Sequence, residues 1–121
     1  MTSKLNILSL SSLLMLLGAC AAPSTPAVSS CQTLLDDASF LSAYRSACVA
    51  ENHADAARYD SESYFAGETL FKRQSCLKHI PDAHIEVSVA AAQAQTENQG
   101  YCAANRHRAE SLLQHYESQK P

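Results

Sequence analysis

The residues of this chain best suited to chemistry are its five cysteines, Cys20, Cys31, Cys48, Cys76 and Cys102. In an oxidising compartment thiols pair into disulfides, and such bridges help to stabilise a small domain. Because five is an odd number, full pairing leaves one thiol over. Cys20 stands apart, close behind an apolar run, and a different chemistry for it leaves an even set of four.

A second group of candidate ligands lies around Pro81, where His79, Asp82, His84 and Glu86 crowd together. Imidazole and carboxylate groups bind metal ions. Their spacing here matches neither the HExxH pattern of a helical zinc site nor a tight pattern of Cys and His. We therefore interpret the segment as a polar loop between helices and predict no metal or other cofactor.

The chain also lacks the motifs of common enzyme classes. Its glycines, Gly18, Gly67 and Gly100, lie too far apart to form a phosphate-binding loop, and no Gly-x-Ser-x-Gly elbow occurs. The neighbouring carboxylates Asp36 and Asp37 point in different directions on a helix, so they do not converge on a substrate. We predict that the protein is not an enzyme and infer no small-molecule substrate.

The N-terminal segment has the organisation of a signal peptide. Lys4 precedes an apolar run over 5–17, which ends in the small residues Gly18 and Ala19. Thirteen residues of helix span only about 20 Å, which is too short for a permanent transmembrane anchor. We expect residues 1–19 to be removed, which leaves 102 of the 121 residues and room for one small domain.

The four residues Leu17-Gly18-Ala19-Cys20 resemble the lipobox of bacterial lipoproteins. The resemblance implies that the Cys20 thiol is acylated, that the chain is cut before it, and that three acyl chains then hold the protein on a membrane. Ala21, rather than Asp, follows this cysteine, which implies the outer membrane. The alternative is an ordinary secretory signal with a chance cysteine at the cleavage site.

The mature chain is expected to be acidic, because loss of Lys4 leaves 8 basic against 12 acidic residues. This balance argues against nucleic acid as a partner, since phosphate binding needs clustered Lys and Arg. Residues 21–30 contain two prolines and no charge, so we interpret 20–30 as a lipidated cysteine with a flexible linker. The domain is then expected over 31–121.

Helices are the elements predicted to position the remaining cysteines. From Cys31 to Val49 the apolar residues recur at helical spacing, with Ser30 as the expected N-cap. A second helix is predicted from a cap at Asp60 or Ser61 to about Lys78, after a loop or short helical turn over 52–59. The expected inward residues of the two helices are Leu34, Leu35, Ala38, Leu41, Tyr44 and Cys48, then Tyr64, Gly67, Leu70, Phe71 and Leu77.

Beyond Pro81 the pattern is mixed. Ile85, Val87 and Val89 alternate as in a strand, but the alanine-rich residues after them favour a helix and a single strand would have no partner. We predict a helix here and a last one over 101–117, with Gly100 as a C-cap or joint. The inward residues expected in the last helix are Cys102, Ala109, Leu112, Leu113 and Tyr116.

The predicted fold is all-α: a small up-and-down bundle of four helices, or of three, with two disulfides. Cys31 and Cys48 lie 17 residues apart on one predicted helix, about 25 Å, so they cannot pair. In an up-and-down bundle of four helices, Cys31 meets Cys76 at one end and Cys48 meets Cys102 at the other. Phe40 and Phe65 fall beside the apolar stripes and are either exposed or part of a wider core.

An anchor, a tether and a small rigid domain without catalytic motifs together suggest a binding or assembly module in the periplasm. The lipobox, the size, the helicity and the segments 44–48 (YRSAC) and 102–106 (CAANR) resemble the pilotins of type II secretion. That resemblance implies a partner in the envelope, a secretin of which a short helix is gripped. This chain has two cysteines more than the pilotin pattern needs, and we transfer no binding site.

A different class of function fits the same features. An inhibitor, immunity or exclusion lipoprotein that blocks a toxin or a cell-wall-acting enzyme would also be small, acidic and exported. Both hypotheses predict another protein as the partner, besides the membrane reached through the lipid.

Overall fold

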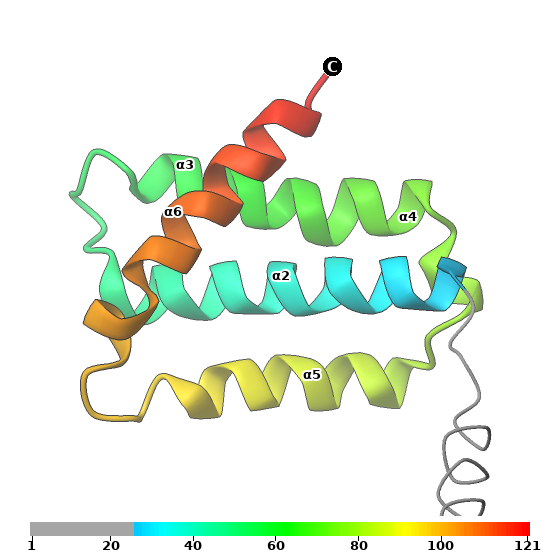
Figure 1. Cartoon of the computed structure of the whole chain (residues 1–121), viewed down its shortest axis with the longest axis horizontal. Helices are drawn as coiled ribbons and strands as arrows, with labels where there is room; N and C mark the ends of the chain where they lie inside the picture. The colour runs from blue at the N-terminus through cyan, green and yellow to red at the C-terminus, as the bar shows by residue number, and fades with distance from the viewer. Residues whose placement is uncertain (1–25) are drawn as a thin grey trace, which may run out of the picture.

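The computed structural model describes residues 26–121, which form helices joined by short loops (Figure 1). The long helices are α2 (Pro26–Cys48), α5 (Asp82–Gln95) and α6 (Tyr101–Gln119). Between α2 and α5 the chain forms α3 (Ala56–Tyr64), the π-helix η3 (Phe65–Leu70), α4 (Phe71–Arg73) and the 3-10 helix η4 (Cys76–Lys78). The predicted signal peptide, the predicted lipidation site Cys20 and most of the predicted linker lie outside the described residues.

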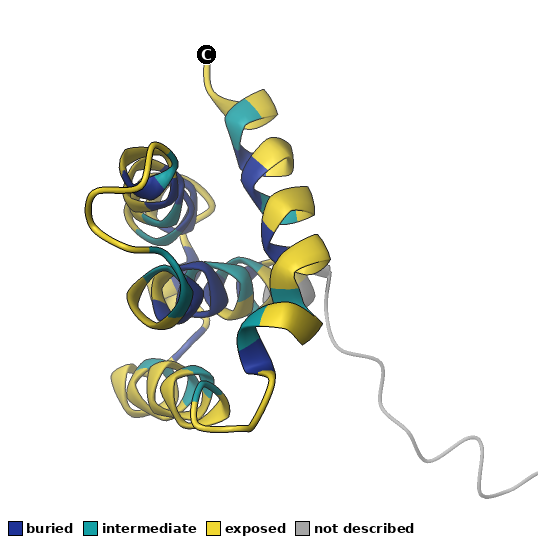
Figure 2. Cartoon of the chain, turned by 90° about the vertical axis from the view of Figure 1, so that its left-hand side faces the viewer, coloured by how far each residue is buried: buried dark blue, intermediate teal, exposed yellow. Residues whose placement is uncertain are grey.

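The helices are arranged as a layer of three crossed by a fourth. The rod formed by α3, η3 and α4 lies beside α2 on one side and α5 lies beside it on the other, while α6 slants across one face of this layer (Figures 1 and 2). Among residues 26–121, no helix lies over the opposite face of α2 (Figure 2). The prediction of a small all-α bundle of four helices is confirmed.

Helix α2 begins at Pro26, within the segment predicted to be linker, so Ser30 lies inside the helix rather than at its cap. Proline is well accommodated in a first helical turn because its missing N–H would have no partner there. The second helix also begins early, at Ala56 rather than near Asp60. This start allows Tyr59 to enter the core, where its ring centroid lies 5.6 Å from that of Tyr44.

The core is wider than the predicted stripes, because Phe40 and Phe65 are both buried. The main cluster lies where α6 crosses α2 and α3, and a smaller cluster surrounds Cys31 and Cys76. Two residues predicted to point inward are exposed instead: Tyr64 at 65% and Leu77 at 57%. Both line the hollow on the face of the layer that α6 does not cover, which leaves their side chains exposed.

The two predicted disulfides are present. Cys31 is bonded to Cys76, and Cys48 is bonded to Cys102, with Cα atoms 5.3 and 5.5 Å apart. Both bridges therefore end on α2. They bracket α5, in which none of the residues is fully buried. Because α5 contributes little to the core, covalent attachment at both of its ends holds it along α2.

Candidate binding groove along α2

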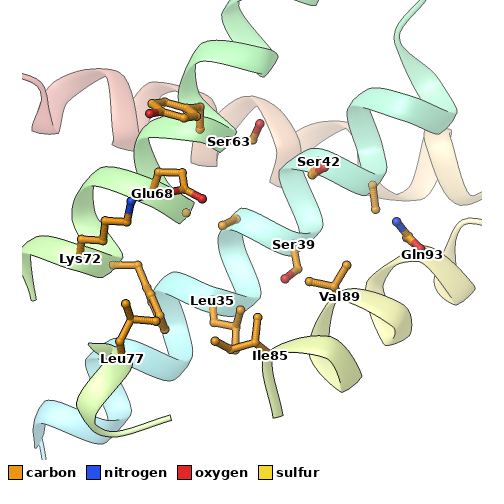
Figure 3. A pocket seen from close by; sticks show the side chains of 15 residues that line it. Leu35, Ser39, Ser42, Ser63, Glu68, Lys72, Leu77, Ile85, Val89 and Gln93 are labelled. Carbon is orange, nitrogen blue, oxygen red and sulfur yellow. Dashed lines mark ion pairs between the residues drawn. The ribbon is translucent and has the colours of Figure 1, made fainter. Parts of the chain in front are cut away.

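The uncovered face of α2 forms the floor of a groove of about 500 Å³, which we call the α2 groove (Figure 3). Its floor consists of Leu35, Ala38, Ser39, Ser42 and Ala43. Their spacing of three and four residues places them on one face of the helix. Apart from Leu35 they are small, so the floor lies low between its neighbours.

The first wall of the groove comes from the rod formed by α3, η3 and α4. It includes Tyr64, Gly67 and Phe71, and at its edge the Lys72 ammonium lies 2.9 Å from the Glu68 carboxylate. Gly67 lies in the π-helical part, and a Cβ added to it would sit 3.5 Å from the Cβ of Ala38. The wall therefore touches the floor closely, which closes the groove on this side.

The second wall comes from α5. Ile85, Val89 and Gln93 follow one another at four-residue spacing and line the groove, and Leu77 in η4 lies at its end (Figure 3). Val87 points to the other side of α5, where it lines a second depression with Phe40 and Arg108. The strand-like alternation of Ile85, Val87 and Val89 thus belongs to a helix that stands between two hollows.

The groove has two chemically different ends. Near the Cys31–Cys76 bridge its lining is large and apolar, with Leu35, Phe71, Leu77 and Ile85. Toward the other end the lining is small and polar, with Ser42, Ser63 and Gln93. A lining that is apolar at one end and polar at the other can hold an amphipathic segment.

The residues considered as metal ligands lie outside this groove lining and do not converge. His79, Asp82, His84 and Glu86 are all exposed, and the His84 Nε2 atom lies 2.6 Å from Oε1 of Gln32 on α2. Within residues 26–121 no group of three or more His, Cys, Asp or Glu side chains is placed to hold a metal ion.

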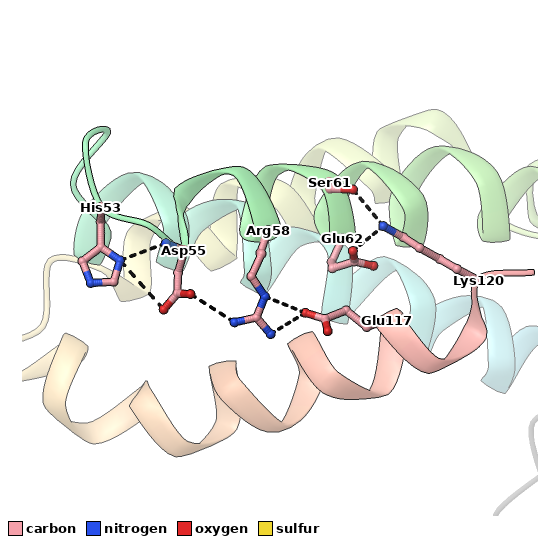
Figure 4. A network of polar contacts seen from close by, with 7 residues as sticks. All are labelled: His53, Asp55, Arg58, Ser61, Glu62, Glu117 and Lys120. Carbon is pink, nitrogen blue, oxygen red and sulfur yellow. Dashed lines mark hydrogen bonds and ion pairs between the residues drawn. The ribbon is translucent and has the colours of Figure 1, made fainter.

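A polar network joins α3 to α6 on the far side of the molecule (Figure 4). Arg58 donates hydrogen bonds of 3.0 and 2.6 Å to Oε1 of Glu117, and of 3.0 Å to Asp55. Near the C-terminus, Lys120 donates to the buried carboxylate of Glu62 and to the Ser61 hydroxyl. These contacts fix the crossing of α6 over α3.

A second buried polar contact joins α6 to α2. The Tyr116 hydroxyl donates a hydrogen bond to the carboxylate of Asp37. Burial disfavours the charged form of Asp37, and this hydrogen bond stabilises that form. Burial raises the pKa of Asp37 above 3.8, and the hydrogen bond from Tyr116 partly opposes that rise. The same burial, followed by the bond to Asp37, raises the pKa of Tyr116 above its ordinary value of 10.0.

The chain matches no protein-family model, and neither a curated protein nor a solved structure shows significant similarity to it. None of the helices in residues 26–121 has the length and apolar character needed to cross a membrane. Sequence reasoning did not locate the α2 groove. One signal in the sequence could have indicated it. Tyr64 and Leu77 are large apolar residues at the two ends of the inward stripe predicted for the second helix, where a neighbouring helix need not cover them.

Proposed function

We propose that this chain is a lipid-anchored binding or assembly module of the bacterial envelope, placed in the periplasm at the outer membrane. Its α2 groove would receive a helix of a larger envelope protein, in the manner of a pilotin that grips a secretin. The observation that carries this proposal is the groove itself: an apolar hollow over a floor of small side chains, on the face left open by α6.

The dimensions of the groove support a helix as the occupant. From Leu35 to Ala43 the floor extends about 12 Å, which equals roughly two turns of helix. Small floor residues such as Ala38 and Ser42 allow a second helix backbone to approach closely, and Phe71 and Ile85 offer apolar contacts from either wall. Recognition of an amphipathic helix in an apolar groove is a common mode of binding between proteins.

The proposed anchor would keep the groove close to the membrane. Only five residues separate Cys20 from the start of α2 at Pro26, a reach of at most about 20 Å. The anchor and the large apolar end of the groove belong to the same end of α2. A partner helix close to the membrane surface would therefore be within reach.

Photocrosslinking in cells tests the groove. A photoreactive phenylalanine analogue would replace Ser42 or Val89 in the groove and, as matched controls, the exposed residues Ser111 or Gln114 on α6. We expect both groove positions to crosslink the same envelope protein and the α6 positions not to. Equal crosslinking from all four positions, or none from the groove, would refute the proposal. A toxin or a wall-degrading enzyme as the crosslinked protein would establish the inhibitor function instead.

Mass spectrometry of the purified mature chain tests the anchor. We expect the chain to begin at Cys20 and to carry acyl groups there. The Cys20→Ser variant should leave the membrane fraction and lose its crosslinks. An unacylated mature chain, or a different first residue, would overturn this part of the proposal.

A further inference from the structure

The two walls of the α2 groove differ in charge. On the first wall Glu68 is paired with Lys72, so the wall is close to neutral. On the second wall, Asp82 lies three residues before the lining residue Ile85, and Glu86 lies three residues before the lining residue Val89. Both carboxylates are exposed, and this spacing places them along the outer edge of α5, beside the groove rather than in its lining. Within residues 26–121 neither of them makes an ion pair or a side-chain hydrogen bond.

From this asymmetry we infer that the occupant of the α2 groove is a basic amphipathic helix of two to three turns, whose Lys or Arg residues lie on the side facing α5. This inference rests on the proposed function and adds the chemistry of the partner to it. The large apolar side chains of that helix would contact Leu35, Phe71 and Ile85. Its basic side chains would face Asp82 and Glu86.

Charge also argues against the other occupants of an apolar groove. The mature chain carries 8 basic against 12 acidic residues, so a second copy would bring further negative charge. Anionic lipid would meet the same carboxylates. A basic helix is the occupant that gains from them, since complementary charges favour encounter and set orientation.

Binding of designed peptides tests the inference. Two fluorescent twelve-residue helices would share one leucine face and carry either lysines or glutamates along one flank of it. Their binding to the purified mature chain in nonionic detergent would be followed by anisotropy, with empty micelles as the blank. We expect the lysine peptide to bind about tenfold more tightly at low salt, and the difference to shrink in about 0.5 M salt, where charges are screened.

Variants locate the effect. Asp82→Asn combined with Glu86→Lys should weaken binding of the lysine peptide about tenfold and strengthen binding of the glutamate peptide. Glu110→Lys on α6 changes the charge of an exposed residue away from the groove and should leave both affinities close to wild type. Ser42→Trp fills the groove and should abolish binding, whereas Ser111→Trp on α6 should not. Circular dichroism would verify that each variant is folded.

The outcomes separate this inference from the proposed function. Equal binding of both peptides, abolished by Ser42→Trp, would overturn the basic partner while the groove remained a helix-binding site. Absence of binding by either peptide would overturn the inference. Sedimentation showing a dimer that Ser42→Trp dissociates would assign the groove to a second copy and overturn it too. Absence of crosslinks from the groove in cells would refute the proposed function itself.

Discussion

The Tyr116 hydroxyl on α6 lies 2.5 Å from Oδ2 of Asp37 on α2 and donates a hydrogen bond to it. The two residues are 79 positions apart in the chain, so the bond helps to fix where the last helix crosses the layer. It also gives the partly buried Asp37 carboxylate a hydrogen-bond donor. Substitution of Tyr116 and substitution of Asp37 should therefore change the free energy of unfolding by different amounts.

Tyr116→Phe removes the donor and leaves the Asp37 carboxylate half-buried without it. We expect the free energy of unfolding at pH 7 to fall by about 1–3 kcal/mol. Urea denaturation followed by circular dichroism measures the change. Asp37→Asn keeps a hydrogen-bond acceptor for Tyr116 and should cost less, and a loss as large as that of Tyr116→Phe would contradict this reading of the contact.

Asp37 also predicts a pH dependence. Because its pKa is raised above 3.8 in the folded chain, the folded state holds more protons than the unfolded state between pH 3.8 and the raised pKa. The stabilising contribution of Asp37 is thus complete below pH 3.8 and is lost as the pH rises through the raised pKa. The stability of wild type relative to Asp37→Asn should therefore decline across this window. A difference that grows with pH would show the opposite shift.

Substitution of two lysines tests how burial changes the contribution of an ion pair to the free energy of unfolding. Lys120 pairs with Glu62, whose side chain is 4% exposed, whereas Lys72 pairs with Glu68, where both side chains are more than half exposed. Lys120→Met leaves a buried charge uncompensated and should lower the free energy of unfolding by about 3 kcal/mol. Lys72→Met should change it by less than about 1 kcal/mol. Similar losses in the two variants would argue against a buried Glu62.

The disulfides should matter most for α5. Replacing Cys31 and Cys76 together by Ala is expected to lower the free energy of unfolding by about 2–4 kcal/mol. Hydrogen exchange should then accelerate more in α5 than in α6, because α5 buries no residue fully while α6 buries Tyr101, Ala109, Leu113 and Tyr116. Uniform acceleration along the chain would show that α5 is held by other contacts.

Leu77 separates binding from stability. Its side chain is 57% exposed at the end of the α2 groove, so Leu77→Ser should change the free energy of unfolding by less than about 0.5 kcal/mol. The same variant should markedly reduce crosslinking from Ser42. If crosslinking is unchanged, the apolar end of the groove takes no part in binding.

The helices could be predicted from local periodicity, and the bridges from helix length together with an expected up-and-down arrangement. Cys31 and Cys48 share a helix and cannot meet, so an up-and-down chain left one arrangement for the four domain cysteines. The secondary structure of the segment with Ile85, Val87 and Val89 was harder to predict, since alternating apolar residues are also typical of a strand. The alanine-rich residues that follow favour a helix, but the reason for the alternation is tertiary, because Ile85 and Val89 line one hollow and Val87 lines another.

The groove could not be predicted for the same reason. Tyr64 and Leu77 occupy positions that in an ordinary bundle would be covered, and the sequence does not reveal that α6 crosses the opposite face. The early start of α2 at Pro26 was missed because prolines and serines were interpreted as linker. Proline at a first helical position is compatible with either interpretation until the rest of the helix is seen.

The attachment of both disulfides to α2 has a mechanical consequence. A pull applied at Pro26 enters this helix directly, and Cys31 and Cys48 pass it on by covalent bonds to the segments before and after α5. Under the proposed function, tension between the membrane anchor and the bound partner would therefore run along α2. The walls of the groove would move together with this helix instead of separating.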